Sequence, residues 1–168
     1  GPGKIAETIG ISLDQAKLII AYLFKLFPSI PRYIEHTKWE LATFGMVETF
    51  FGRRRRFAIK NATGYLRKRA ERQAVNFKIQ STSSDIVMQC LLHIAPIIKK
   101  LGGQVLLTVH DSIGFEIPRA LVTALPQLVK THLTDYARKI APWLPVDFSW
   151  DCEVGPNYGE LKDYKEYI

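Results

Sequence analysis

Cysteine is scarce in this sequence, which has two such residues among 168. Cys90 and Cys152 are too few for a disulfide-stabilised scaffold, and they lack the close spacing of zinc ligands. No apolar run reaches the roughly 18 residues that span a bilayer, and the first residues lack the order of a secretory signal. We therefore expect a protein of a reducing, cytoplasmic compartment with no membrane partner.

Acidic residues are outnumbered: 16 Asp and Glu stand against 23 Lys and Arg, a formal net charge of +7. Hydrophobic residues make up 47% of the chain, an ordinary share for a globular protein with a packed core. Many basic residues fall within one short stretch: Arg53, Arg54, Arg55, Arg56, Lys60, Arg67, Lys68, Arg69 and Arg72. Such a cluster predicts a polyanionic partner, because Lys and Arg neutralise phosphates. A solvated charged face is the alternative.

The first 45 residues carry helical signals. Ser12 followed by Gln15 is a capping-box pattern, and apolar residues at helical spacing follow it. A second helix is predicted from about Pro31 to Phe44, where Gly45 provides a left-handed stop. The two helices predict a helical lobe.

Four apolar residues of the first of these helices have two possible roles: Ile19, Tyr22, Leu23 and Phe27. They fill the core of the lobe, or they form a face on which a partner docks. The sequence pattern is the same in both cases, so both alternatives stay open.

Residues 46–59 predict a hairpin, because β-branched and aromatic residues precede Gly52 and the arginines follow it. Residues 63–101 then have helical spacing, in one helix or in two segments that meet near Asn76. The hairpin is expected to connect the helical lobe to the remainder of the chain.

The last third of the chain adds strands to the pattern. Residues 104–109 and 112–118 are two apolar, β-branched runs that predict a tight hairpin. Residues 119–140 return to helical spacing, and residues 146–154 alternate like a closing strand. The order of elements indicates an α+β fold with a mainly antiparallel sheet packed on helices.

An aspartate lies between the two apolar runs, in the dipeptide His110-Asp111. Tight hairpins favour Asn-Gly or other Gly-containing turns, so the strand pairing does not require this dipeptide. A carboxylate at a hairpin tip projects without surrounding bulk, as a hard divalent cation such as Mg²⁺ requires. The dipeptide is thus a candidate metal ligand, and a simple turn is the alternative.

Four motifs in this order resemble family A DNA polymerases, the kind related to bacterial DNA polymerase I. The segment from Val109 to Ser112 resembles the motif C hairpin of that family, and Glu71 to Asn76 resembles the helix before it. The other two matches are the hairpin Gly52-Arg53-Arg54 and the terminal Gly155-Pro156-Asn157-Tyr158. The resemblance implies that residues 1–62 form the remainder of a fingers subdomain with a connecting basic hairpin. Residues 63–168 would form the C-terminal portion of a palm subdomain.

The resemblance also implies a role for each matched position. Asp111 would be a catalytic ligand of Mg²⁺, and His110 would lie near the primer terminus. Primer-template DNA and deoxynucleoside triphosphates would be the substrates. Eight residues would contact the DNA: Arg72, Asn76, Gln80, Arg53, Arg54, Arg67, Lys68 and Arg69. Arg72, Asn76 and Gln80 recur every four residues, which places them on one helical face.

The sequence departs from the family pattern in two ways. The family usually has a second acidic residue directly after the motif C aspartate, and this chain has Ser112. The family's first catalytic aspartate and its nucleotide-contacting fingers helix would lie before Gly1. Two-metal phosphoryl transfer needs more than one carboxylate, so the chain is expected to be inactive alone.

Three hypotheses follow. The first is a fragment or subunit of a split polymerase, active with a second polypeptide, in the nucleoid-associated cytoplasm of a bacterium, with a phage-infected cell as one setting. The second is a non-catalytic DNA-binding accessory protein derived from a polymerase palm, which Ser112 favours. The third is a basic α+β domain whose motifs match by coincidence.

Overall fold

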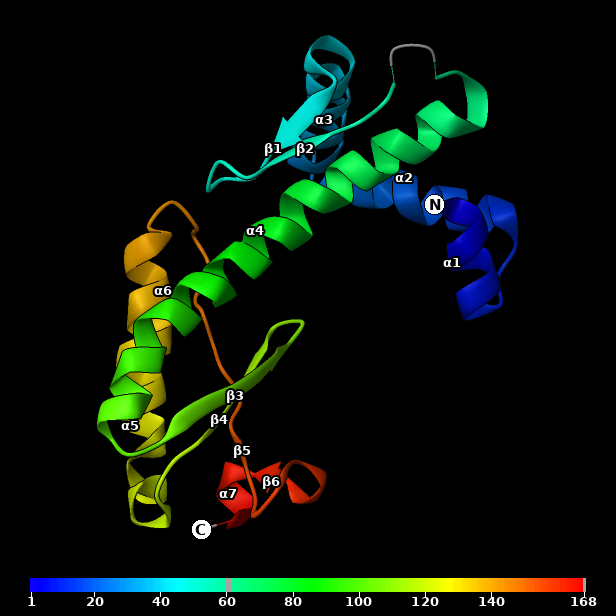
Figure 1. Ribbon diagram of the computed structural model, residues 1–168. Helices are drawn as coiled ribbons and strands as arrows, with labels where there is room; N and C mark the ends of the chain where they lie inside the picture. Colours follow the sequence, from blue (N-terminus) through cyan, green and yellow to red (C-terminus); the bar gives the residue numbers. More distant parts are fainter. Residues whose placement is uncertain (60–61, 168) are drawn as a thin grey trace. The chain divides into compact units, whose positions relative to one another are not determined.

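The computed structural model describes residues 1–59 and 62–167. The chain forms two compact units, residues 1–79 and 80–168, and helix α4 (Gly64–Lys100) belongs to both (Figure 1). Over the described residues, no helix combines the length and the apolar character needed to cross a bilayer. The two units are described separately below.

Three helices open the first unit: α1 (Pro2–Ile9), α2 (Leu13–Leu26) and α3 (Ser29–Phe44). The capping box at Ser12 is confirmed: the Gln15 backbone N–H donates to Ser12 Oγ at 3.2 Å, and the Ser12 N–H donates to Gln15 Oε1 at 2.9 Å. The left-handed stop at Gly45, with φ of 65°, is confirmed as well. Helix α1 was not predicted, although Pro2 in its first turn and the left-handed Gly10 after it are its signals.

The predicted basic hairpin is confirmed but is shorter than expected. Strand β1 (Met46–Glu48) pairs antiparallel with β2 (Arg54–Arg56), with Met46 opposite Arg56. A small core ties this hairpin to α3 and α4. Its buried residues are Leu41, Val47, Ile59 and Ala74, and Phe57, Ala62, Ala70 and Phe77 pack against them.

Helix α2 leaves most of its apolar residues in solvent. Ala16 is its only buried residue, and α1 has none. The side chains of Ile19, Tyr22, Leu23 and Phe27 are exposed, as are those of Ile9, Leu13, Leu18 and Leu26. Ile19, Tyr22, Leu23 and Phe27 therefore do not fill a core among the described residues, which leaves the docking face as their predicted role.

The second unit is built on the C-terminal part of α4, which is one continuous helix without a break near Asn76. Its buried residues include Ile86, Cys90, Ile94 and Ile98. Residues 119–140, predicted as one helix, are helical, but the type of helix changes along the segment. The segment consists of η1 (Arg119–Ala124), α5 (Leu125–Val129), the π-helical η2 (Lys130–Thr134) and α6 (Asp135–Ile140). This segment lies beside α4 (Figure 1), and the Cys90 thiol contacts the Leu133 carbonyl oxygen at 3.8 Å.

The second predicted hairpin is confirmed. Strand β3 (Gln104–Val109) pairs antiparallel with β4 (Ser112–Glu116). Val109 lies opposite Ser112, and the register shifts between Val105 and Leu107. The two residues between the strands are therefore a two-residue turn.

The prediction of a strand over residues 146–154 is wrong for most of that segment. Only β5 (Glu153–Val154) is a strand, and it pairs with β6 (Lys162–Asp163). Phe148 and Trp150 are half-buried and alternate with exposed neighbours. The segment thus has the burial pattern of a strand, but its backbone is not paired with a neighbouring strand. In the described part of the chain, the buried Nε1 of Trp150 also lacks a hydrogen-bond partner.

The α+β class is confirmed. The described strands form three separate two-stranded antiparallel sheets, and helices supply the rest of the fold. The chain ends in η3 (Tyr158–Glu160) and α7 (Tyr164–Tyr167).

Candidate catalytic and nucleic-acid-binding site

His110 and Asp111 form the turn between β3 and β4, and both are exposed. His110 has a φ of 55°, the only positive φ of a non-glycine residue in the described chain. Such a conformation costs roughly 1–3 kcal/mol and concentrates at functional sites. A positive φ is also what the first residue of a two-residue hairpin turn requires, so the tight turn accounts for this conformation and holds Asp111 at its tip.

Ser112 closes this turn. Its Oγ donates a hydrogen bond of 2.8 Å to the carbonyl oxygen of Val109, the residue opposite it in the hairpin. The hydroxyl stabilises the turn at the position where the family usually carries a second acid. Asp111 is therefore the single carboxylate of the turn.

Mg²⁺ prefers carboxylate and water oxygens, and the exposed Asp111 carboxylate fits it as one ligand. No cluster of three or more His, Cys, Asp or Glu side chains occurs over residues 1–59 and 62–167. Asp111 can therefore contribute to a metal site, but the described residues do not complete one around it.

Arg72 and Asn76 lie on the exposed face of α4 in the first unit. Gln80, four residues further along the same helix, is also exposed. The i, i+4 spacing predicted from the sequence is thus realised in one continuous helix, and the three polar side chains follow one helical face.

Two arginines of the β1–β2 hairpin pack on aromatic rings. Arg53 lies over the Phe77 ring, with 5.9 Å from Cζ to the ring centroid, and Arg55 lies 4.9 Å from the Phe57 centroid and 5.8 Å from that of Phe77. Sequence reasoning missed Phe77, although an aromatic residue next to Asn76 in a helix that follows the arginines was a signal. Cation–π contacts fix the guanidinium planes while leaving their edges able to bind phosphate.

The basic cluster contains both paired and unpaired cations. Arg54 pairs with Glu48 at 2.5 Å, and Arg67 pairs with Glu71 at 3.3 Å. Within the described ranges, five others form no ion pair: Arg55, Arg56, Lys68, Arg69 and Arg72. Lys60, also part of the predicted cluster, lies outside the described residues.

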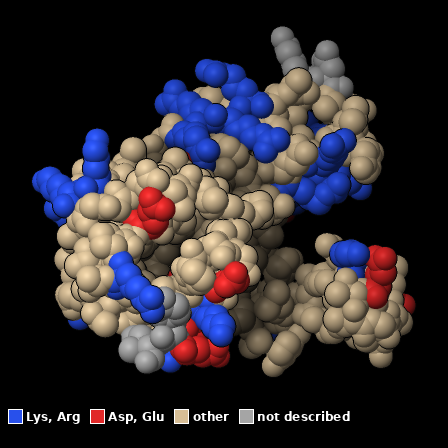
Figure 2. Space-filling view, turned by 60° about the horizontal axis from the view of Figure 1, so that its bottom comes forward, with Lys and Arg blue, Asp and Glu red and all other residues tan. Residues whose placement is uncertain are grey.

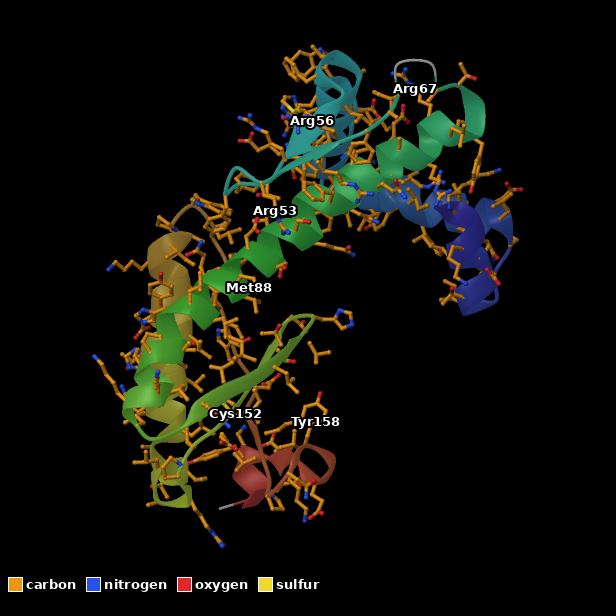
Figure 3. The ribbon with its side chains drawn as sticks, viewed as in Figure 1. Arg53, Arg56, Arg67, Met88, Cys152 and Tyr158 are labelled. Carbon is orange, nitrogen blue, oxygen red and sulfur yellow. The ribbon has the colours of Figure 1, made fainter. Side chains whose placement is uncertain are left out.

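Lys and Arg side chains outnumber acidic ones on part of the protein surface. Figure 2 shows a broad area of Lys and Arg side chains with few acidic ones among them. Figure 3 shows where Arg53, Arg56 and Arg67 project from the hairpin and the start of α4. The unpaired members of the cluster are the ones most available to a polyanion, because no carboxylate already neutralises them.

Comparison with known proteins supports the motif analysis. The sequence profile of DNA polymerase family A matches residues 1–160. DNA polymerase I of Chloroflexus aurantiacus is 34% identical over 159 residues, which cover 94% of this chain and 16% of that protein. The thermostable DNA polymerase I of Thermus filiformis is 32% identical over 153 residues, which cover 90% of this chain and 18% of that protein.

A solved structure agrees with the sequence matches. The POL domain of Pol1 from M. smegmatis, in complex with DNA primer-template and dNTP, is similar with a TM-score of 0.72 and 28% identity. The similarity covers 80% of this chain and 24% of that one. The fold is thus that of part of a polymerase domain.

The chain belongs to DNA polymerase family A. It spans about a sixth of the length of the bacterial relatives described above, 16% and 18% respectively.

Proposed function

We propose that this chain is the C-terminal portion of a family A DNA-directed DNA polymerase, active only with a second polypeptide that carries the rest of the catalytic site. The observation that carries the proposal is the exposed Asp111 at the tip of the β3–β4 turn, in a chain of this family. Residues 1–62 would belong to the fingers and residues 63–168 to the palm.

Asp111 would ligate Mg²⁺ and is the proposed catalytic residue. The bound metal supplies charge stabilisation at the transferring phosphoryl group. His110 would lie against the primer terminus, since the turn places it beside Asp111.

Primer-template DNA and deoxynucleoside triphosphates are the proposed substrates. The M. smegmatis relative is bound to both kinds of ligand. Arg72, Asn76 and Gln80 on α4 would contact the duplex close to the insertion site. Arg53, Arg54, Arg67, Lys68 and Arg69 would contact its phosphates.

A second polypeptide is proposed because two metal ions about 3.5–4 Å apart need more carboxylates than one aspartate provides. Ser112 cannot replace the missing acid. The exposed apolar face of α2 is the proposed docking surface, because burying Ile19, Tyr22, Leu23 and Phe27 against the partner would remove their apolar area from water.

Primer extension tests this proposal directly. The purified 168-residue chain is incubated with primer-template, Mg²⁺ and four nucleotides, with and without a separately expressed polypeptide from the same source that carries the upstream polymerase region. Extension is expected only when both polypeptides are present. Extension by the chain alone would contradict the proposed dependence on a partner.

A non-catalytic DNA-binding accessory protein is the second candidate, and Ser112 in place of an acid favours it. The two functions differ in what Asp111 does. A pure binding surface gains nothing from a carboxylate that faces phosphates. If the chain is only an accessory protein, Asp111→Ala would therefore strengthen DNA binding and would not affect synthesis by the complete enzyme.

Salt dependence of duplex binding tests the cationic surface. The slope of log Kobs against log[salt] is expected to be steep and to decrease in magnitude by about one in Arg69→Ala, which removes an unpaired cation. Arg54→Ala is the matched control, because Arg54 is already paired with Glu48 and its loss is expected to change the slope less. Fluorescence anisotropy with a labelled primer-template measures both slopes. A flat salt dependence would remove this assignment of the phosphate contacts, and equal changes would show that the ion pair with Glu48 does not reduce the contribution of Arg54.

A further inference from the structure

Two histidines outside the proposed polymerase site face each other in the second unit. His93 lies on α4 and His132 on the π-helical η2, and His93 Nε2 is 3.4 Å from His132 Nδ1. The two rings are tilted by 46° with centroids 5.5 Å apart. Both side chains are half-buried, so solvent reaches the pair.

A stacking partner holds the His93 ring. His93 stacks on Tyr136 with a centroid distance of 3.9 Å and an interplanar angle of 2°. His93 follows the buried Cys90 and precedes the buried Ile94, and Leu133 next to His132 is buried too. The two histidines therefore lie beside buried residues of α4 and η2, and stacking on Tyr136 orients the His93 ring.

The separation of the two nitrogens fits a tetrahedral metal ion. Zinc–imidazole bonds of about 2.0–2.1 Å at a tetrahedral angle place two ligand nitrogens about 3.3–3.4 Å apart. Zn²⁺ also suits imidazole ligands, and unoccupied positions around it are commonly filled by water. The same distance between the two nitrogens permits a hydrogen bond when one of them carries a hydrogen and the other accepts it. A bound metal ion would take the place of that hydrogen.

We propose that His93 and His132 form a zinc site that clamps α4 to η2, with water completing the coordination. The two residues are 39 positions apart in the sequence, so the ion closes a long loop and stabilises the folded second unit. This site is independent of Asp111 and of the proposed Mg²⁺ chemistry. Over the described ranges no third His, Cys, Asp or Glu joins the pair, so the site is open and exchanges zinc readily.

The electrostatic surroundings of His93 have opposing effects. Burial lowers the pKa of His93, and its neighbours His132 and Lys139 lower it further. A lowered pKa keeps the imidazole neutral, with a free lone pair for the metal, at neutral pH. Lys139, in contrast, repels a cation. Burial raises the pKa of the nearby Cys90 thiol to about 11, which keeps that thiol protonated and structural.

Zinc titration of the full 168-residue chain tests the proposal. The chain carries Asp111→Ala so that the proposed magnesium ligand does not contribute. Zn²⁺ in excess is expected to raise the thermal unfolding midpoint, and Co²⁺ is expected to give a tetrahedral visible spectrum. His93→Gln and His132→Gln should each weaken zinc binding by at least about tenfold. Loss of a residue that only hydrogen-bonds to a metal ligand already lowers metal affinity by about tenfold or more, and loss of the ligand itself should cost no less.

The controls are built into the same chain. His36→Gln removes an exposed histidine elsewhere and should leave zinc binding unchanged, and Mg²⁺ should give no stabilisation. Lys139→Gln is expected to tighten zinc binding, which a variant that merely misfolds would not do. The proposal is overturned if zinc does not stabilise the chain, or if both glutamine variants bind zinc as well as the parent does; the histidines are then a hydrogen-bonded pair only.

Discussion

Asp111→Ala is expected to lower the rate of nucleotide incorporation by the complete polymerase by roughly a thousandfold or more. A metal ion contributes several kcal/mol of transition-state stabilisation, and each 1.36 kcal/mol is a factor of ten in rate. Asp111 is the one carboxylate of the β3–β4 turn, so no neighbouring acid replaces it. Single-turnover primer extension with both polypeptides present measures this effect, and binding of primer-template should be retained.

Ser112→Ala is the matched control at the next position. It removes the hydrogen bond from Oγ to the Val109 carbonyl oxygen but no anionic ligand. We expect a small loss of stability, about 1 kcal/mol, and incorporation within about tenfold of the parent. If Ser112→Ala were as damaging as Asp111→Ala, the rigidity of the turn and not the carboxylate would be the essential feature. If Asp111→Ala were active, the accessory-protein function would be favoured.

The candidate site was predictable where its signals are local. Two apolar runs separated by two polar residues define a hairpin and its tip within 13 residues, so the position of Asp111 follows from strand pairing alone. The i, i+4 spacing of Arg72, Asn76 and Gln80 needed only a helix, and α4 is continuous there. The packing of Arg53 and Arg55 on Phe77 was not predictable, because it joins β2 to a helix through the tertiary fold.

The fold shows the same division between local and long-range information. The capping box at Ser12 and the stop at Gly45 were read directly from residue types. The prediction of a strand over residues 146–154 was wrong because the alternation of apolar and polar residues indicates which side chains are buried. It does not indicate which backbone groups form hydrogen bonds. Phe148 and Trp150 keep that alternation without a neighbouring strand. Strand pairing depends on a partner distant in sequence, which periodicity does not identify.

Gly103→Ala is expected to destabilise the second unit by about 3 kcal/mol. A methyl group at residue 103 would lie 2.1 Å from the backbone carbonyl oxygen of Glu116 and 3.1 Å from Cγ2 of the buried Ile98. Glu116 pairs with Gln104 at the base of the β3–β4 hairpin, so its carbonyl oxygen cannot move without disturbing the ladder. Overpacking against backbone falls at the upper end of the roughly 1–3 kcal/mol found for such changes. Urea unfolding followed by circular dichroism measures the difference.

The hairpin that Gly103 anchors also carries Asp111, so the same variant should lose polymerase activity through displacement of the turn. Gly3→Ala is the matched control, because a methyl group there meets no atom within 4 Å and replaces glycine inside α1. That change is expected to leave stability unchanged or raise it by up to about 1 kcal/mol. Equal unfolding midpoints for the two variants would show that residues 103 and 116 do not approach so closely. A stable but inactive Gly103→Ala would show that the base of the hairpin positions Asp111 without limiting the stability of the fold.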